Sequence, residues 1–125
     1  MKIEVSNGDI VDKMTILRIK ESRISDPIKL KNINTEIEYL MPSFEQIGVT
    51  ESSSDYLRLL SVNENIWDGE DRLREQETRK NIEDDFVDIA RSIRLWNEER
   101  CDIKRVINIE TSSSIVEEKN YTRIN

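Results

Sequence analysis

The sequence contains no histidine and only one cysteine, three glycines and two prolines in 125 residues. The absence of histidine removes the commonest general base at neutral pH and the commonest ligand of transition metals, so we expect neither a metal nor another cofactor. The single cysteine, Cys101, cannot form a disulfide within the chain, which is typical of a reducing cytoplasm. Because Cys101 falls at the edge of an apolar helix face, we expect it to be a buried packing residue.

Long apolar runs are also missing. No stretch approaches the ~20 apolar residues of a membrane-spanning helix, and the N-terminus does not resemble a signal peptide. The net charge of −7 argues against a nucleic-acid binder, although it does not exclude a local cationic pocket. We expect a cytoplasmic protein that binds neither nucleic acid nor membrane.

What the sequence has in excess is charge and isoleucine. Charged residues make up 36% of the chain, which with so little glycine and proline favours long helices in a single domain spanning residues 1–125. Eighteen isoleucines and ten asparagines against one alanine indicate an AT-rich genome, such as that of a phage or a streamlined bacterium.

The fold predicted from apolar spacing and cap residues is an all-α antiparallel bundle of two helical hairpins. Ser6 and Asp26 are the expected caps of the first two helices, and Pro42 is expected to end the second and open a loop to Ser54. The predicted helices cover residues 8–24, 27–41, about 54–80 with Ser54 or Asp55 as cap, and 86–109 with Asp84 or Asp85 as cap. Residues 1–5 and 115–119 are candidates for two short paired strands, and residues 110–125 form a polar tail.

The apolar stripes of the first two helices are regular. Ile16 and Ile19 fall on a second side of the first helix, so this helix should touch two neighbours or a second subunit. The main stripes are Ile10, Met14, Leu17 and Ile24 in the first helix, and Leu30, Ile33, Ile37 and Leu40 in the second.

The third and fourth helices carry polar residues within their apolar faces. In the third helix, Asn63, Glu70 and Arg74 fall between the stripe of Leu59, Ile66 and Leu73 and the line of Leu60 and Trp67. In the fourth, the arc of Phe86, Ile89, Ile93, Trp96, Ile103 and Ile107 includes Asn97, Arg100 and Lys104. Because the two helices should pack antiparallel, we predict that these polar sets, together with Glu77, meet each other.

Two interpretations of the predicted contact between these polar residues remain open. The first is a buried network of salt bridges and amides that determines helix register or subunit pairing. The second is a pocket, between helices or between subunits of a homo-oligomer, that binds an anionic, nucleotide-like small molecule. Arginine and lysine would bind its anionic group, the asparagines would read hydrogen-bonding edges, and the tryptophans would stack on a ring or fill the core. The candidate ligand-binding residues are Asn63, Trp67, Glu70, Arg74, Trp96, Asn97, Arg100 and Lys104.

Catalysis is the less favoured alternative. Helical dimers of the chorismate-mutase type catalyse a rearrangement with interhelical cations and amides, without histidine or metal, but no spacing here matches them beyond analogy. Helical nucleotide pyrophosphohydrolases need clustered carboxylates for Mg²⁺, whereas here acidic and basic residues alternate. The acidic run of residues 83–85 is interpreted as helix-cap chemistry rather than a metal site.

Several segments resemble one family along essentially the whole chain. They are the opening MKIEVSNGDIVDKMTIL, WDGEDRLR at residues 67–74, Ala90-Arg91-Ser92, Asn97, Arg100, and VEEKNY at residues 116–121. This pattern is similar to a family of small bacterial and phage proteins known only as a domain of unknown function, and departs from it at Asp9 and Gly69. The resemblance implies no settled activity; bacterial relatives encoded near cell-surface polysaccharide genes imply an accessory role at most.

Overall fold

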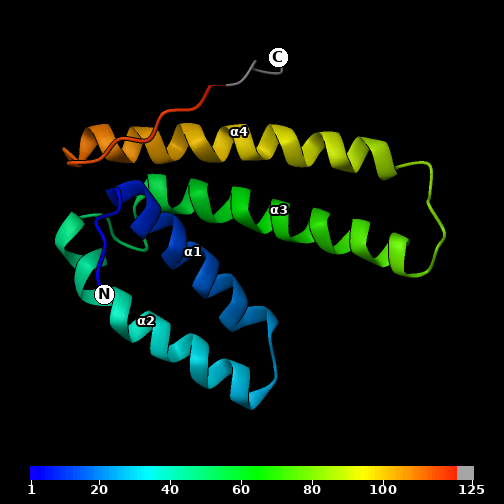
Figure 1. Ribbon diagram of the computed structural model, residues 1–125, viewed down its shortest axis with the longest axis horizontal. Helices are drawn as coiled ribbons and strands as arrows, with labels where there is room; N and C mark the ends of the chain where they lie inside the picture. The colour runs from blue at the N-terminus through cyan, green and yellow to red at the C-terminus, as the bar shows by residue number, and fades with distance from the viewer. Residues whose placement is uncertain (121–125) are drawn as a thin grey trace.

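The computed structural model describes residues 1–120, and all its regular secondary structure in that range is helical. The four helices are α1 (Asn7–Arg23), α2 (Pro27–Ile47), α3 (Ser54–Thr78) and α4 (Phe86–Glu110). They form two antiparallel hairpins, α1–α2 and α3–α4, with α1 lying between α2 and the other hairpin (Figure 1). The predicted helical bundle of two hairpins is therefore confirmed.

The two hairpins are inclined to each other. Helix α1 diverges from α3 toward its C-terminal end, and the connected ends of α3 and α4 extend beyond the first hairpin (Figure 1). The core lies around α1, the helix that packs against each of the other three. Its buried apolar residues are Val11, Met14, Leu17, Ile33, Ile37, Phe44, Tyr56, Leu59, Val62, Ile103 and Ile107. The predicted main stripes of α1 and α2 pack in or against this core.

The caps of the first hairpin form as the sequence predicts. The Ser6 hydroxyl accepts a hydrogen bond from the Asp9 amide at 3.1 Å. The Asp26 carboxylate accepts from the amide of Ile28 at 2.9 Å, directly before Pro27 at the first helical position. The N-cap position of α3 is Ser53, one residue before the predicted Ser54 or Asp55, and that of α4 is the predicted Asp85, but neither side chain makes a capping hydrogen bond.

The prediction that Pro42 ends the second helix is wrong. Helix α2 continues through Pro42 to Ile47 and ends at Gly48, whose φ of 89° is in the left-handed region. Pro42 lies on the exposed side, and the additional turn buries Phe44, whose ring meets that of Tyr56 edge to face at 5.9 Å between centroids. Burial of this aromatic ring offsets the hydrogen bond lost at proline.

The ends of the described chain do not form the two short strands considered from the sequence. Residues 1–5 and 115–119 have no strand or bridge assignment. Instead, residues 113–120 run back along α4 (Figure 1), and we call them the C-terminal strap. Part of the predicted polar tail, residues 121–125, lies outside the described residues. No helix within residues 1–120 combines the length and apolarity needed to cross a membrane.

Candidate functional site

A polar network connects α1, α3 and α4 inside the bundle. The Asp12 carboxylate accepts hydrogen bonds from Arg100 Nε at 2.9 Å, Arg100 Nη2 at 2.6 Å and Asn63 Nδ2 at 2.8 Å. Asn63 Nδ2 also donates to Thr15 Oγ1 at 2.8 Å, and that hydroxyl donates to the Asp12 carbonyl at 2.6 Å. Asp12, Thr15 and Asn63 are all buried, so the network removes the cost of leaving these groups without partners.

The ionisation of Arg100 follows from this geometry. The hydrogen bonds to Asp12 raise the pKa of Arg100 above its usual value, although burial acts in the opposite direction. The side chain remains 29% exposed, so one edge of the guanidinium faces outward. No group within residues 1–120 accepts a hydrogen bond from the Nη1 atom of Arg100.

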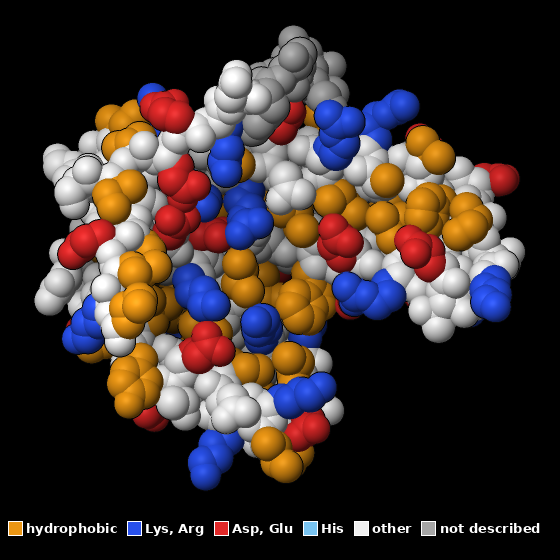
Figure 2. Space-filling model, viewed as in Figure 1, with side chains coloured by type: hydrophobic (Ala, Val, Ile, Leu, Met, Phe, Trp, Pro, Cys, Tyr) orange, Lys and Arg blue, Asp and Glu red, His pale blue; other side chains and the backbone are white. Residues whose placement is uncertain are grey.

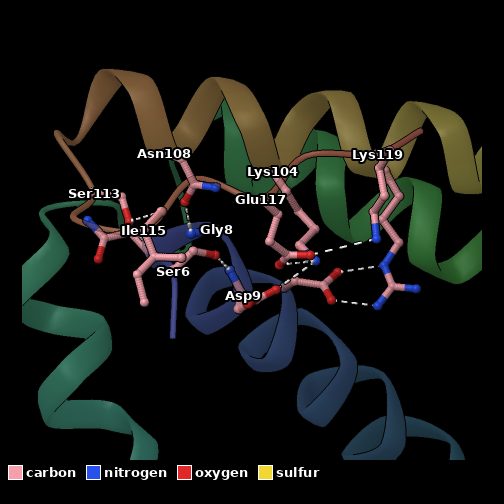
Figure 3. Close-up of polar contacts among 12 residues, drawn as sticks. Ser6, Gly8, Asp9, Lys104, Asn108, Ser113, Ile115, Glu117 and Lys119 are labelled. Carbon is pink, nitrogen blue, oxygen red and sulfur yellow. Dashed lines mark hydrogen bonds and ion pairs between the residues drawn. The ribbon is translucent and has the colours of Figure 1, made fainter. Parts of the chain in front are cut away.

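A second charged cluster surrounds Lys104. Lys104 Nζ lies 2.7 Å from Asp9 Oδ1 and 3.5 Å from Glu117 Oε1, and Glu117 Oε2 lies 3.7 Å from Lys119 Nζ. Figure 3 shows the side chains of Lys104 and Glu117 reaching toward Asp9 of α1, with Lys119 beyond the Glu117 carboxylate. Burial lowers the pKa of Lys104, but the interactions with Asp9 and the neighbouring carboxylates raise it more, so its pKa lies above the usual value.

The first turn of α1 packs directly on α4. The Gly8 amide donates to Asn108 Oδ1 at 2.6 Å, and Asn7 donates through its amide to Ser113 Oγ at 2.9 Å. A Cβ atom at Gly8 would lie 2.6 Å from the Lys104 carbonyl oxygen, so only glycine permits this approach. The contact brings Asp9 and Asp12 within reach of Lys104 and Arg100.

Two depressions open on either side of Arg100. The first, of about 290 Å³, is here called the apolar hollow; it lies in the angle between α1 and α3, where Figure 2 shows hydrophobic side chains gathered. It is lined by Ile16, Ile19, Asn63, Ile66, Trp67, Glu70, Asp71, Arg74 and Arg100. The second, of about 560 Å³, is here called the basic groove, and is lined by Arg94, Asn97, Glu98, Arg100, Cys101, Lys104 and Lys119. Figure 2 shows lysine and arginine side chains over α4 and its junction with α1.

The eight candidate residues do not form one buried cluster. Asn63, Trp67, Glu70, Arg74 and Arg100 line the apolar hollow, whereas Asn97, Arg100 and Lys104 line the basic groove. Trp96 lines neither; it packs against the core and against Gly69, where an added Cβ would lie 3.3 Å from its ring. Only Arg100 belongs to both groups.

The prediction that the polar sets of the third and fourth helices pair with each other is wrong. Glu70, Arg74 and Glu77 are exposed, and Arg74 pairs with Asp71 on its own helix at 3.2 Å. The reason is the rotation of α3: Gly69 and Gln76, each one residue earlier, are buried toward α4 in their place. The acidic partners of Arg100 and Lys104 come from α1 and, for Lys104, also from Glu117 of the strap.

Sequence reasoning missed six residues of these clusters in this role. The pattern predicts for Asp9 only a favourable position at the start of the first helix, and it predicts no site role for Asp12, Thr15, Arg94, Glu117 or Lys119. Asp9 and Asp12 are three residues apart, as are Arg94 and Asn97, so helical spacing alone could have placed each pair on a common face. No local pattern places Lys119 beside Lys104.

The prediction of a buried Cys101 is also wrong. Its side chain is only partly buried and lines the basic groove. The strap passes over α4 near Cys101. Its ion pairs there are made by exposed side chains, so the strap leaves Cys101 only partly covered. Among residues 1–120, no group of three or more cysteine, aspartate or glutamate side chains is arranged to hold a metal ion.

The fold and these clusters define an all-helical protein in which one inclined hairpin is attached to another through acidic groups on α1 and basic groups on α4. The chain belongs to a family of unknown function, DUF6165, whose pattern matches residues 1–124. No match to a curated protein or to a solved structure was found.

Proposed function

We propose that the protein is a non-enzymatic binding protein for a small anionic molecule, held on the surface around Arg100. The observation that carries this proposal is the composition of the basic groove. Four cationic side chains, an amide and a single carboxylate line it, in a chain whose net charge is −7. A concentration of positive charge against that background favours an anion at this position over the rest of the surface.

The state of Arg100 supports the proposal. Asp12 holds its guanidinium through two hydrogen bonds, so little side-chain entropy remains to be lost when a ligand binds. Arg94 differs from Arg100 because its side chain forms no ion pair with residues 1–120. No carboxylate within these residues therefore neutralises its charge. Arginine can bind carboxylate or phosphate oxygens in pairs.

The apolar hollow supports a ligand with a ring attached to its anionic group. Arg100 borders both depressions, so one molecule can place its anion in the basic groove and its ring against Trp67. A nucleotide-like molecule has this form. Asn63 plays a smaller part than the sequence suggested, because its amide is already committed to Asp12 and Thr15.

Isothermal titration with inorganic phosphate and with nucleoside monophosphates tests the proposal. We expect Arg94→Gln to weaken phosphate binding by about five- to tenfold without loss of stability, since removing one charge contact costs on the order of 1 kcal/mol. Arg91→Gln is the matched control, because Arg91 is exposed on the same helix and does not line the groove. Equal effects of the two variants, or no binding of any of these anions by the wild-type protein, would contradict the proposal.

Self-association is part of the proposal. Leu95, Val106 and Ile109 of α4 are 38%, 36% and 61% exposed, which leaves apolar area available to a second copy. Sedimentation velocity over a range of concentrations should detect a dimer or larger species, and Leu95→Glu should shift it toward monomer. A single monomeric species throughout would remove this part of the proposal and leave the anion site in place.

A structural role is the second candidate, and it is favoured for the buried part of the network. Asp12, Thr15 and Asn63 satisfy one another and Arg100, as expected of groups that hold α1 in register on α3 and α4. An enzyme of the chorismate-mutase kind would use the same cations and amides, and no further observation on residues 1–120 favours it over binding.

A further inference from the structure

The Glu117 carboxylate lies beside the basic groove, in a depression of about 150 Å³ under the C-terminal strap that Lys104 and Lys119 also line. One of its oxygens is 3.5 Å from Lys104 Nζ and the other is 3.7 Å from Lys119 Nζ (Figure 3). Both lysines line the basic groove. A carboxylate of the chain itself therefore bridges two of the four cations that we propose to receive a ligand.

We infer that Glu117 occupies the position in which the basic groove takes the carboxylate or phosphate group of its ligand, and that the ligand displaces this side chain. The inference rests on the proposed function and adds to it the place of the anionic group and the competitor that a ligand must replace.

The contacts of Glu117 are weak enough to be exchanged. Its two ion pairs, at 3.5 and 3.7 Å, are longer than the 2.7 Å pair of Lys104 with Asp9. The side chain is 37% exposed and that of Lys119 is 47% exposed, and ion pairs at such sites contribute little.

The surroundings of Glu117 stay in place when its side chain turns away. Lys104 keeps its pair with Asp9, and the strap is attached on both sides of Glu117. Before it, Ser113 Oγ donates to the Ile115 carbonyl at 2.7 Å and accepts from the Asn7 amide. After it, Glu118 pairs with Arg105 at 2.7 Å. Lys119 therefore remains beside the groove, where a phosphate can contact both ammonium groups and the guanidinium of Arg100.

Two variants at neighbouring positions distinguish displacement of Glu117 by a ligand from the general effect of removing one negative charge. Glu117→Gln and Glu118→Gln remove the same charge from adjacent positions, but Glu118 pairs with Arg105, which does not line the basic groove. We expect Glu117→Gln to lower the dissociation constant of inorganic phosphate by about three- to tenfold, as for removal of a competing exposed ion pair. Glu118→Gln should stay within about twofold of the wild type, since its ion pair is not one that phosphate replaces.

The side-chain carboxyl resonances of glutamate give a direct second readout. Adding phosphate to the wild-type protein should move the carbon resonance of Glu117 and leave that of Glu118 nearly unchanged. Equal gains in affinity for the two variants, no gain for Glu117→Gln, or an unmoved Glu117 resonance at phosphate saturation would overturn the inference. If phosphate still binds and Arg94→Gln still weakens it, the proposed function survives that failure. If neither the wild type nor Glu117→Gln binds phosphate, both fail.

Discussion

The Asp12–Arg100 pair shows how far single residues could be predicted. The periodicity of the fourth helix correctly marked Arg100 as polar within an apolar arc, and that of the third did the same for Asn63. Their common partner was not identified, because Asp12 lies 88 residues from Arg100 in the chain and precedes the helices whose patterns were compared. Periodicity locates a polar group on a face; it does not identify the element that covers that face.

We predict that Asp12→Ala destabilises the protein by about 2–4 kcal/mol, because it leaves Arg100 and the Asn63 amide without their acceptor in a mostly buried setting. Urea denaturation measures the change. Arg23→Ala is the comparison: Arg23 also pairs with carboxylates across helices, but on the exposed surface with Asp68 and Glu64. Its cost should be clearly smaller than that of Asp12→Ala, because exposed ion pairs contribute little. If the two variants lost similar amounts of unfolding free energy, the buried Asp12 network would contribute no more to stability than an exposed ion pair.

Gly8 gives a second prediction at this scale. An alanine there brings Cβ to 2.6 Å from the Lys104 carbonyl oxygen and 3.0 Å from Asn108 Oδ1, so α1 must move away from α4. We expect Gly8→Ala to cost about 2–3 kcal/mol, in the range of overpacked interiors. Gly48→Ala provides the contrast. It meets nothing within 4 Å and should cost only about 1–2 kcal/mol for its positive φ. A Gly8→Ala protein as stable as the wild type would show that the close approach is not required.

Among the elements, α2 and α3 show where sequence rules fail. The ends of α1 and α4 were predicted to within about one residue, because Ser6 and Asp85 occupy the expected N-cap positions, although only Ser6 makes a capping hydrogen bond. In α2, tertiary burial of Phe44 overrides the local preference of Pro42 to stop a helix. In α3, Gly69 and Gln76 rather than Glu70 and Glu77 face α4, a rotation that apolar spacing alone does not determine.

Pro42→Ala tests the balance in α2. The substitution restores a backbone donor inside a helix and leaves Phe44 and Ile47 in place, so we expect the free energy of unfolding to rise by about 1–2 kcal/mol. This is less than the full ~3 kcal/mol of an interior proline, because the unfolded chain also gains freedom. Thermal unfolding followed by circular dichroism measures it. A fall in stability would mean that the helix needs its proline to direct Phe44 toward Tyr56.

For the whole molecule, the packing of α1 on α4 and the return of the strap were beyond prediction. The Lys104–Asp9 and Lys104–Glu117 pairs join segments that no hairpin rule brings together. The net charge of −7 predicted neither contact; it only makes a local group of cationic side chains unusual in this acidic chain.

The Asp9–Lys104 pair makes the attachment of the two hairpins depend on pH. Burial raises the pKa of Asp9, but its hydrogen bonds with Glu117 and Lys104 lower it more, so its folded pKa lies below 3.8. A lowered acid pKa contributes stability that is present above about pH 4 and is lost as pH falls through the folded pKa. The pKa of Lys104 is raised above 10.5, so its contribution is complete below that pH and is lost as pH rises through the folded pKa. The pair therefore stabilises the fold between about pH 4 and pH 10.5.

Asp9→Asn removes this contribution and should destabilise the protein by about 1 kcal/mol at pH 7, given the partial exposure of both side chains. The difference from the wild type should narrow below pH 4, where Asp9 becomes protonated, and should shrink again above pH 10.5. Asp88→Asn is the matched control. Asp88 occupies the first turn of α4 as Asp9 does that of α1, so both variants lose the interaction with a helix dipole, but only Asp9 has the lysine. Parallel pH profiles of the two variants, measured by urea denaturation from pH 3 to pH 11, would mean that Lys104 does not join the hairpins through Asp9.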